Sequence, residues 1–254
     1  MPTRSSAKAE KETDMIIYLT NDPIDIKTAA LQAANGFSEL FCADAASLQR
    51  ALYIGADPQK TEEHDAMAKQ ILSAMQKTGL NISVCSVLDE RTKADAEALV
   101  ASAELIVLGD GDVCTQHAFL EEIGLGALLA LHAGVLLCIG SGAVCASSDV
   151  YVQPEGKGAV TDLLYKKHLY GLGLTRVSVV PHFCMGSQQA AMAKSIGPER
   201  ITYRGERAHM PYAIPKGTFI LCQDGNAVMF GEGYLIEDEY AIRYCRENEC
   251  RRMD

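Results

Sequence analysis

Short apolar runs alternate with longer segments of helical period over most of the chain, and this alternation restricts its possible folds more than any other feature. Runs rich in branched side chains predict strands, and apolar residues three or four apart predict helices. Strands separated by helices favour an α/β domain of three layers, α/β/α, with a mainly parallel central sheet. The expected strands are 15–20, 51–56, 82–88, 104–109, 135–139 and 177–183. The expected helices are 26–34, a segment around 67–75, 92–102, 115–131, part of 160–169 and 188–195.

Local signals mark several boundaries of these elements. Gly79 can end the helix around 67–75 in a left-handed conformation. Thr92 and Asp95 have the spacing of a capping box at the start of the next helix. Near the end of the chain, two apolar runs meet at Asp224-Gly225, a dipeptide that favours a tight hairpin. A C-terminal antiparallel hairpin is therefore expected to close the sheet.

The stretch 123–148 contains no charged side chain, and its part 124–146 is about long enough to span a bilayer. It also holds five glycines and His132, and acidic residues rather than basic ones flank it. We interpret it as a helix end, a turn at 132–134, a buried strand and a glycine-rich turn. The net charge of −10 argues against nucleic acid as a partner, because Lys and Arg carry most of that affinity. Neither a membrane nor a nucleic acid is an expected partner.

The domain organisation follows from composition. Residues 1–14 are predicted to be a disordered leader, 15–245 a single α/β hydrolytic-type domain, and 246–254 a charged, frayed tail. Nine cysteines without a Cys-x-x-Cys pair favour buried thiols in a reducing compartment, and no secretory signal is apparent, so a cytoplasmic location is expected. No ligand spacing for a metal and no complete dinucleotide-binding motif is present in the sequence, so we expect no cofactor.

Three strand exits are candidate catalytic or binding sites, because ligands of parallel sheets bind at the carboxyl ends of strands. The first is the glycine-rich turn 109–112, which could also be a plain turn before a helix. The second is 140–143, which has the shape of a nucleophile elbow but also suits an ordinary strand-to-helix turn. The third is Pro181-His182-Phe183, where the histidine could be a general base or a core residue.

Together and in this order, the three exits resemble the peptidase E and cyanophycinase family of serine peptidases, which have a class I glutamine amidotransferase-like fold. That family shows a GGN-type turn, an elbow of the form GxSAGA and a PHF or QHF histidine. The segments VLGDGDVCTQHAFLEEIGL, CIGSGAVCAS and VVPHF occupy these places, and the resemblance extends over 15–236. It implies hydrolysis of small aspartyl peptides or isopeptides.

The elbow departs from the family pattern at the position of the nucleophile. Aligning Gly142-Ala143 with the final Gly-Ala of the motif puts Gly140 at the nucleophile position. A slip of one residue would make Ser141 the nucleophile, at the cost of a rebuilt turn. Asp110 also stands where a second glycine is common. A carboxylate there would oppose an oxyanion unless it points away.

If the resemblance holds for activity, it implies a role for each site residue. Ser141 would be the nucleophile, His182 the base and Asp149 the acid that orients it, while backbone N–H groups near Gly111 and Gly142 would hold the oxyanion. Cys138 and Cys145 are weaker candidates for a nucleophile. The expected function is a dipeptidase-like serine hydrolase, and the alternative is an inactive family member that binds a small ligand or protein in the same cleft. The expected partner is a small peptide or peptide-like ligand, and a homodimer is compatible with the sequence.

Overall fold

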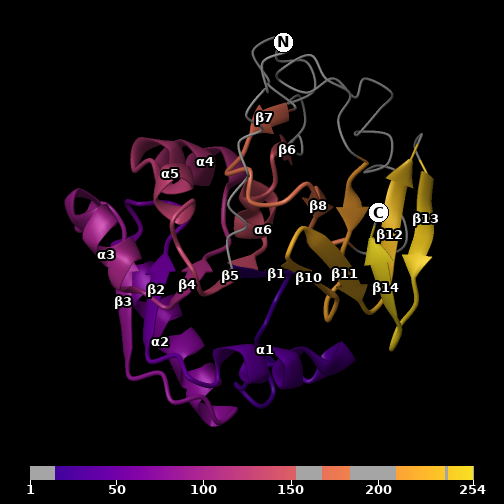
Figure 1. The fold of residues 1–254 in the computed structure, drawn as a ribbon, viewed down its shortest axis with the longest axis horizontal. Helices are drawn as coiled ribbons and strands as arrows, with labels where there is room; N and C mark the ends of the chain where they lie inside the picture. Colours follow the sequence, from indigo (N-terminus) through magenta and orange to yellow (C-terminus); the bar gives the residue numbers. More distant parts are fainter. Residues whose placement is uncertain (1–14, 153–167, 184–209, 238–239, 254) are drawn as a thin grey trace, which may run out of the picture.

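The computed structural model of the chain describes residues 15–152, 168–183, 210–237 and 240–253 (Figure 1). An eight-stranded sheet with the order β14-β11-β10-β1-β5-β4-β2-β3 forms its centre. Five adjacent strands are parallel, which confirms the predicted α/β class: β1 (Ile16–Thr20), β5 (Val135–Ile139), β4 (Leu105–Leu108), β2 (Arg50–Ile54) and β3 (Val84–Leu88).

The antiparallel end of the sheet comes from the C-terminal part of the chain. The predicted hairpin is confirmed: Asp224 and Gly225 have φ values of 51° and 71°, as a tight two-residue turn requires. A second sheet, β13-β12-β9-β8, and the pair β6-β7 complete the described strands. The bounds are β10 (Phe219–Gln223), β11 (Asn226–Phe230), β14 (Cys250–Met253), β6 (Asp149–Tyr151), β7 (His168–Tyr170), β8 (Val179–Val180), β9 (Tyr212–Ala213), β12 (Gly233–Glu237) and β13 (Tyr240–Cys245).

Helices cover both faces of the large sheet (Figure 1). Strand β1 shows why, because Tyr18 packs among Phe37 and Phe41 on one face while Ile17 and Leu19 join a separate core on the other. The first face is covered by α1 (Phe37–Ala45) and α2 (Thr61–Lys77). The second face is covered by α3 (Ala96–Ser102), α4 (Val113–Glu122), α5 (Leu125–Leu129) and α6 (Ser141–Ala146).

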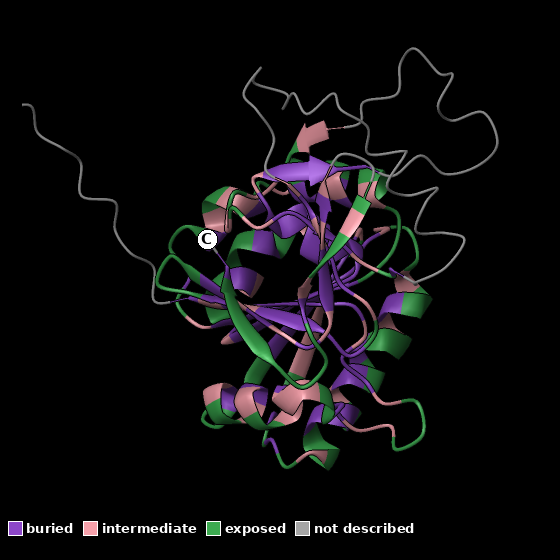
Figure 2. Cartoon of the chain, turned by 90° about the vertical axis from the view of Figure 1, so that its right-hand side faces the viewer, coloured by how far each residue is buried: buried purple, intermediate pink, exposed green. Residues whose placement is uncertain are grey.

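The second half of the charge-free stretch, residues 135–147, is buried throughout. Strand β5 lies between β1 and β4, and every residue from Val135 to Ile139 is buried. Figure 2 shows the central strands in the buried colour and the exposed residues on the outer faces of the helices. None of the described helices has the length and apolar character needed to cross a membrane. The interpretation of this stretch as a buried strand between turns is confirmed.

The first predicted helix is wrong, and a helix follows that the prediction missed. Residues 26–30 form a turn and a bend because the Asp25 carboxylate accepts hydrogen bonds from the backbone N–H groups of Lys27 and Thr28. Ala29 then has a positive φ of 51°. The helix of this region is instead α1, which buries Phe37 and Phe41.

Two helix boundaries and the tail also differ from the prediction. Gly124, with φ of 63°, divides the predicted helix 115–131 into α4 and α5. The Thr92 hydroxyl donates to the carbonyl of Val87 instead of capping a helix. The tail is not frayed at 250–253, because β14 pairs with β11 and Met253 is buried.

The remaining predictions fall partly outside the described residues. Strand 177–183 is reduced to the two residues of β8. The end of the segment 160–169 lies in β7, while its first part and the predicted helix 188–195 lie outside the described residues, as does the leader 1–14. All eight cysteines in the described ranges are free thiols.

Candidate functional site

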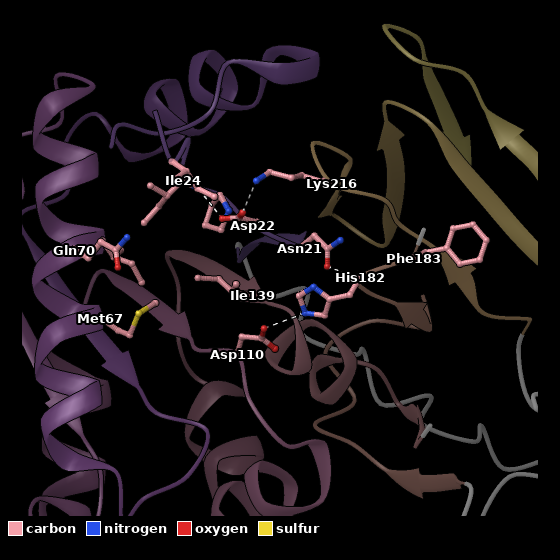
Figure 3. Close-up of a pocket in the computed structure, with 13 residues that line it drawn as sticks. Asn21, Asp22, Ile24, Met67, Gln70, Asp110, Ile139, His182, Phe183 and Lys216 are labelled. Atoms are coloured by element: carbon pink, nitrogen blue, oxygen red, sulfur yellow. Dashed lines mark hydrogen bonds and ion pairs between the residues drawn. The ribbon is translucent and has the colours of Figure 1, made fainter. Parts of the chain in front are cut away.

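The exits of β1, β4 and β5 share one edge of the sheet, and the chain after β8 joins them there (Figure 3). This edge borders a cleft of about 410 Å³. The cleft is walled by the segment after β1, by one face of α2, by the exits of β4 and β5, and by the chain after β8 and β9. Its lining residues are Asn21, Asp22, Pro23, Ile24, Ile26, Met67, Gln70, Ile71, Asp110, Ile139, His182, Phe183 and Lys216.

Gly140 forms the apex of the turn between β5 and α6. Its φ of 52° and ψ of −114° lie in a region that side chains rarely adopt, as expected for the strained turn of an elbow. A Cβ atom at this position would overlap with the carboxylate of Asp110. The predicted strand-to-helix turn is present, and Gly140 rather than Ser141 stands at its apex.

The Asp110 carboxylate fills the space above Gly140. Its Oδ1 accepts hydrogen bonds from the backbone N–H groups of Ser141 at 2.8 Å and Gly111 at 2.9 Å. Its Oδ2 lies 3.0 Å from Nε2 of His182. Burial alone would raise the pKa of Asp110, but the hydrogen bonds from His182 and from the two amides outweigh it and hold the pKa below its usual value.

The backbone at His182 is held in an uncommon conformation. His182 has a φ of 57°, and its N–H donates to Oδ1 of Asn21 at 2.7 Å. Asn21 is buried and in turn donates from Nδ2 to the carbonyl of Ile214 at 2.9 Å. The hydrogen bond to Asp110 raises the pKa of His182, which favours the charged imidazolium. Asn21 therefore positions the imidazole against Asp110.

The Ser141 hydroxyl takes part in a different, buried network. Ser141 Oγ donates to Oε1 of Gln116 at 2.6 Å, and Nε2 of Gln116 donates to the carbonyl of Gly109 at 2.8 Å. Ser141 is 2% exposed and Gln116 is fully buried. The hydroxyl thus ties α6 to α4 and to the exit of β4.

The other predicted site residues lie in separate contacts. The Asp149 carboxylate contacts Nδ1 of His168 at 3.1 Å, across the pair β6-β7, rather than His182. A Cβ atom at Gly142 would overlap with Leu108, so Gly142 serves the close packing of α6 on β4. Gly111 does supply an amide at the elbow, but the second amide comes from Ser141. The structure thus brings Gly111, Gly140 and His182 together around Asp110, and the predicted catalytic roles stay predictions.

Neither cysteine candidate has the character of a nucleophile. Cys138 and Cys145 are both buried, and burial raises the pKa of the Cys145 thiol to about 12 and that of Cys138 well above its ordinary value. Because the thiolate is the reactive form, both side chains are inert packing residues in this structure. No cluster of His, Cys, Asp and Glu within the described ranges could hold a metal ion.

Sequence reasoning missed Asn21 and Gln116, and it treated Asp110 only as a departure from the family turn. Asn21 could have been found from its place, because it directly follows the exit of β1. Gln116 has no such signal, since a polar residue on a helix is usually solvated. Only the packing of α4 against α6 shows that it is buried.

Comparison with known proteins agrees with this architecture. Among solved structures, a protein of Listeria monocytogenes EGD-e described as a "Putative Peptidase E Protein" matches with a TM-score of 0.57 and 15% identity. The match covers 86% of this chain and 98% of that protein, and at this identity it shows the likeness of the folds. No curated protein matches the sequence. The model of Peptidase family S51 matches residues 31–243, so the chain belongs to peptidase family S51.

Proposed function

We propose that this member of peptidase family S51 binds a small peptide or peptide-like ligand in the cleft beside Asp110 and His182, without hydrolysing it through a serine. The main support for the proposal is the position of the Asp110 carboxylate. It occupies the space in which an elbow side chain would stand, above a glycine that has no side chain to attack a carbonyl carbon. The expected function was a serine hydrolase, and this arrangement favours the non-catalytic alternative.

The two amides at the elbow support the same proposal. In acyl transfer, backbone N–H groups of this kind stabilise the oxyanion, and each donor contributes about 2.7–4 kcal/mol to transition-state stabilisation. Here the amides of Gly111 and Ser141 already donate to one oxygen of Asp110. A developing oxyanion would have to displace a group of like charge, which opposes hydrolysis.

The contacts of Ser141 give further support. A nucleophilic serine needs a base within hydrogen-bond reach. The partner of Ser141 Oγ is the amide oxygen of Gln116, which is a poor proton acceptor, and His182 is paired with Asp110. Hydrolysis through Ser141 would require both contacts to break.

The cleft itself suits a small ligand. Its volume of about 410 Å³ lies within the usual range for small-molecule sites, about 300–1,000 Å³. Most of its accessible surface is apolar, as in typical small-molecule sites, while six of its thirteen lining residues are polar or charged.

Reaction with an alkyl fluorophosphonate tests the absence of a serine nucleophile. A reactive serine oxygen attacks the phosphorus and expels fluoride, which adds the phosphonyl group to the mass of the intact protein. We expect no adduct on the wild type, with an active serine hydrolase as the reagent control.

If the wild type does form an adduct, the Ser141→Ala variant shows whether Ser141 or another serine has reacted. An adduct on the wild type that is lost in Ser141→Ala would overturn the proposal and make Ser141 the nucleophile. An equal adduct on both proteins would also overturn it and assign the reaction to another serine.

A further inference from the structure

Apolar side chains from two different elements line one end of the cleft. Ile26, in the segment after β1, is 79% exposed, and Met67, on α2, is 37% exposed. Ile24, Ile71 and Ile139 add buried apolar surface to the same lining. Figure 3 shows Met67 and His182 on opposite sides of the cavity, with Ile139 between them. A ligand that covers this surface would release water from exposed aliphatic groups, which favours binding.

The positive charges of the cleft are already paired. Among the described residues of its lining, Lys216 and His182 are the two side chains that can carry positive charge. Lys216 Nζ lies 3.1 Å from Asp22, and His182 lies 3.0 Å from Asp110. A carboxylate brought into the cleft would meet these two acidic partners as well as the cations. The lining therefore discriminates against an acidic ligand.

From these two observations we infer that the cleft selects its ligand through an uncharged aliphatic or aromatic side chain, and not through a carboxylate. This inference rests on the proposed binding function and adds the chemical class of the ligand. It departs from the aspartyl peptides that the family resemblance implies.

The other end of the cleft supplies the polar contacts that a peptide needs. The side chains of Asp110 and His182 are 39% and 58% exposed, so both can be reached from the cavity. A carboxylate accepts hydrogen bonds from amide N–H groups, and a protonated imidazole donates to carbonyl oxygens. The apolar end selects the side chain, while this pair binds the backbone of the ligand.

Two capped dipeptides that differ in one side chain test the inference on the full chain. The probes are acetyl-Leu-Leu-amide and acetyl-Asp-Leu-amide, and their dissociation constants are measured by saturation-transfer NMR titration. We expect the leucine peptide to bind about tenfold more tightly or better, as full burial of a leucine side chain implies. Equal or tighter binding of the aspartyl peptide would overturn the inference.

A matched pair of surface variants assigns the effect to the cleft. Ile26→Asn is expected to weaken binding of the leucine peptide by about threefold or more. Leu131→Asn is the control, because Leu131 is 84% exposed in the turn after α5 and does not line the cleft, and it should leave affinity unchanged. Equal affinities of the two variants would overturn the inference.

Absence of binding of either dipeptide up to about 10 mM would also overturn the inference. The proposed lack of serine hydrolysis would survive all of these failures, because it depends on the fluorophosphonate result. Conversely, an adduct on a serine would refute that proposal without changing the order of the two affinities.

Discussion

Two polar networks meet at the turn around Gly140, and they differ in burial. One joins Ser141, Gln116 and the carbonyl of Gly109 inside the protein, and the other joins Asp110 to His182 at the cleft. Breaking a buried hydrogen bond leaves polar groups without partners, which costs about 1–3 kcal/mol. An exposed ion pair contributes about 0–1 kcal/mol, because water competes for both groups. The same turn thus contains a network that stabilises the fold and a pair that remains accessible to a ligand.

The largest effect is expected from Gly140→Ala, which displaces the Asp110 carboxylate and strains the turn that both networks share. The new Cβ atom would overlap with the Asp110 carboxylate in a backbone conformation that is already unfavourable for alanine. We expect a loss of about 3 kcal/mol in the free energy of unfolding, measured by denaturant titration.

Gly124→Ala is the control for the backbone contribution. Gly124 also has a positive φ, but no atom lies within 4 Å of the position that a Cβ atom would take there. We expect a loss of about 1 kcal/mol in the free energy of unfolding. Asp110→Gly should restore part of the stability of Gly140→Ala, whereas equal costs at the two glycines would show that the carboxylate does not fill this space.

A smaller effect is expected from Gln116→Leu, which breaks only the buried network. The variant leaves the Ser141 hydroxyl and the carbonyl of Gly109 without their partner, so we expect a loss of about 2 kcal/mol in the free energy of unfolding. Because Ser141→Ala removes one of the stranded groups, the double variant should lose less than the sum of the two single losses. Additive losses would contradict the coupling.

The smallest effect on stability is expected from Asp110→Asn, which neutralises one member of the exposed pair. We expect a loss of at most about 1 kcal/mol. The pKa of His182, measured by NMR titration of its imidazole, should fall toward its ordinary value of 6.5 because the charged partner is gone. An unchanged pKa would contradict the pairing of His182 with Asp110.

The directions of the two pKa shifts predict the pH range in which Asp110→Asn lowers the free energy of unfolding. The pKa of His182 is raised on folding, so its contribution is present below pH 6.5 and is lost as the pH rises through the raised value. The pKa of Asp110 is lowered, so its contribution is present above pH 3.8 and is lost as the pH falls through the lowered value. The stability difference between wild type and Asp110→Asn should therefore be largest between pH 3.8 and pH 6.5. A maximum above pH 8 would contradict the pairing of Asp110 with His182.

The fold prediction was most accurate for the segments that are most deeply buried. Strand β5 and the helix face of Ile71 and Met75 are deeply buried, so their apolar period is visible in the sequence. The segment 26–34 has a helical pattern as well, but the side chain of Asp25 offers its backbone a competing turn. The strand 250–253 was missed because three of its four residues are exposed and polar or small. Its pairing with β11 depends on a contact distant in sequence.

The sequence predicted where the site lies in the fold, but not which of its side chains contact one another. Strand exits can be read from the sequence because parallel strands end at one edge of the sheet. The partner of each side chain cannot be read in this way. Ser141 lies one residue from the apex, yet its side chain turns toward Gln116, while the carboxylate that meets His182 comes from a turn 72 residues away.

The sequence by itself determined the mainly parallel sheet, the turn at Gly140 and the resemblance to the peptidase E family, because these depend on local pattern and motif order. Only the tertiary structure decided what fills the space above Gly140. A glycine leaves room for an atom from elsewhere in the chain, and the folding of β4 beside β5 brings the Asp110 carboxylate into that room.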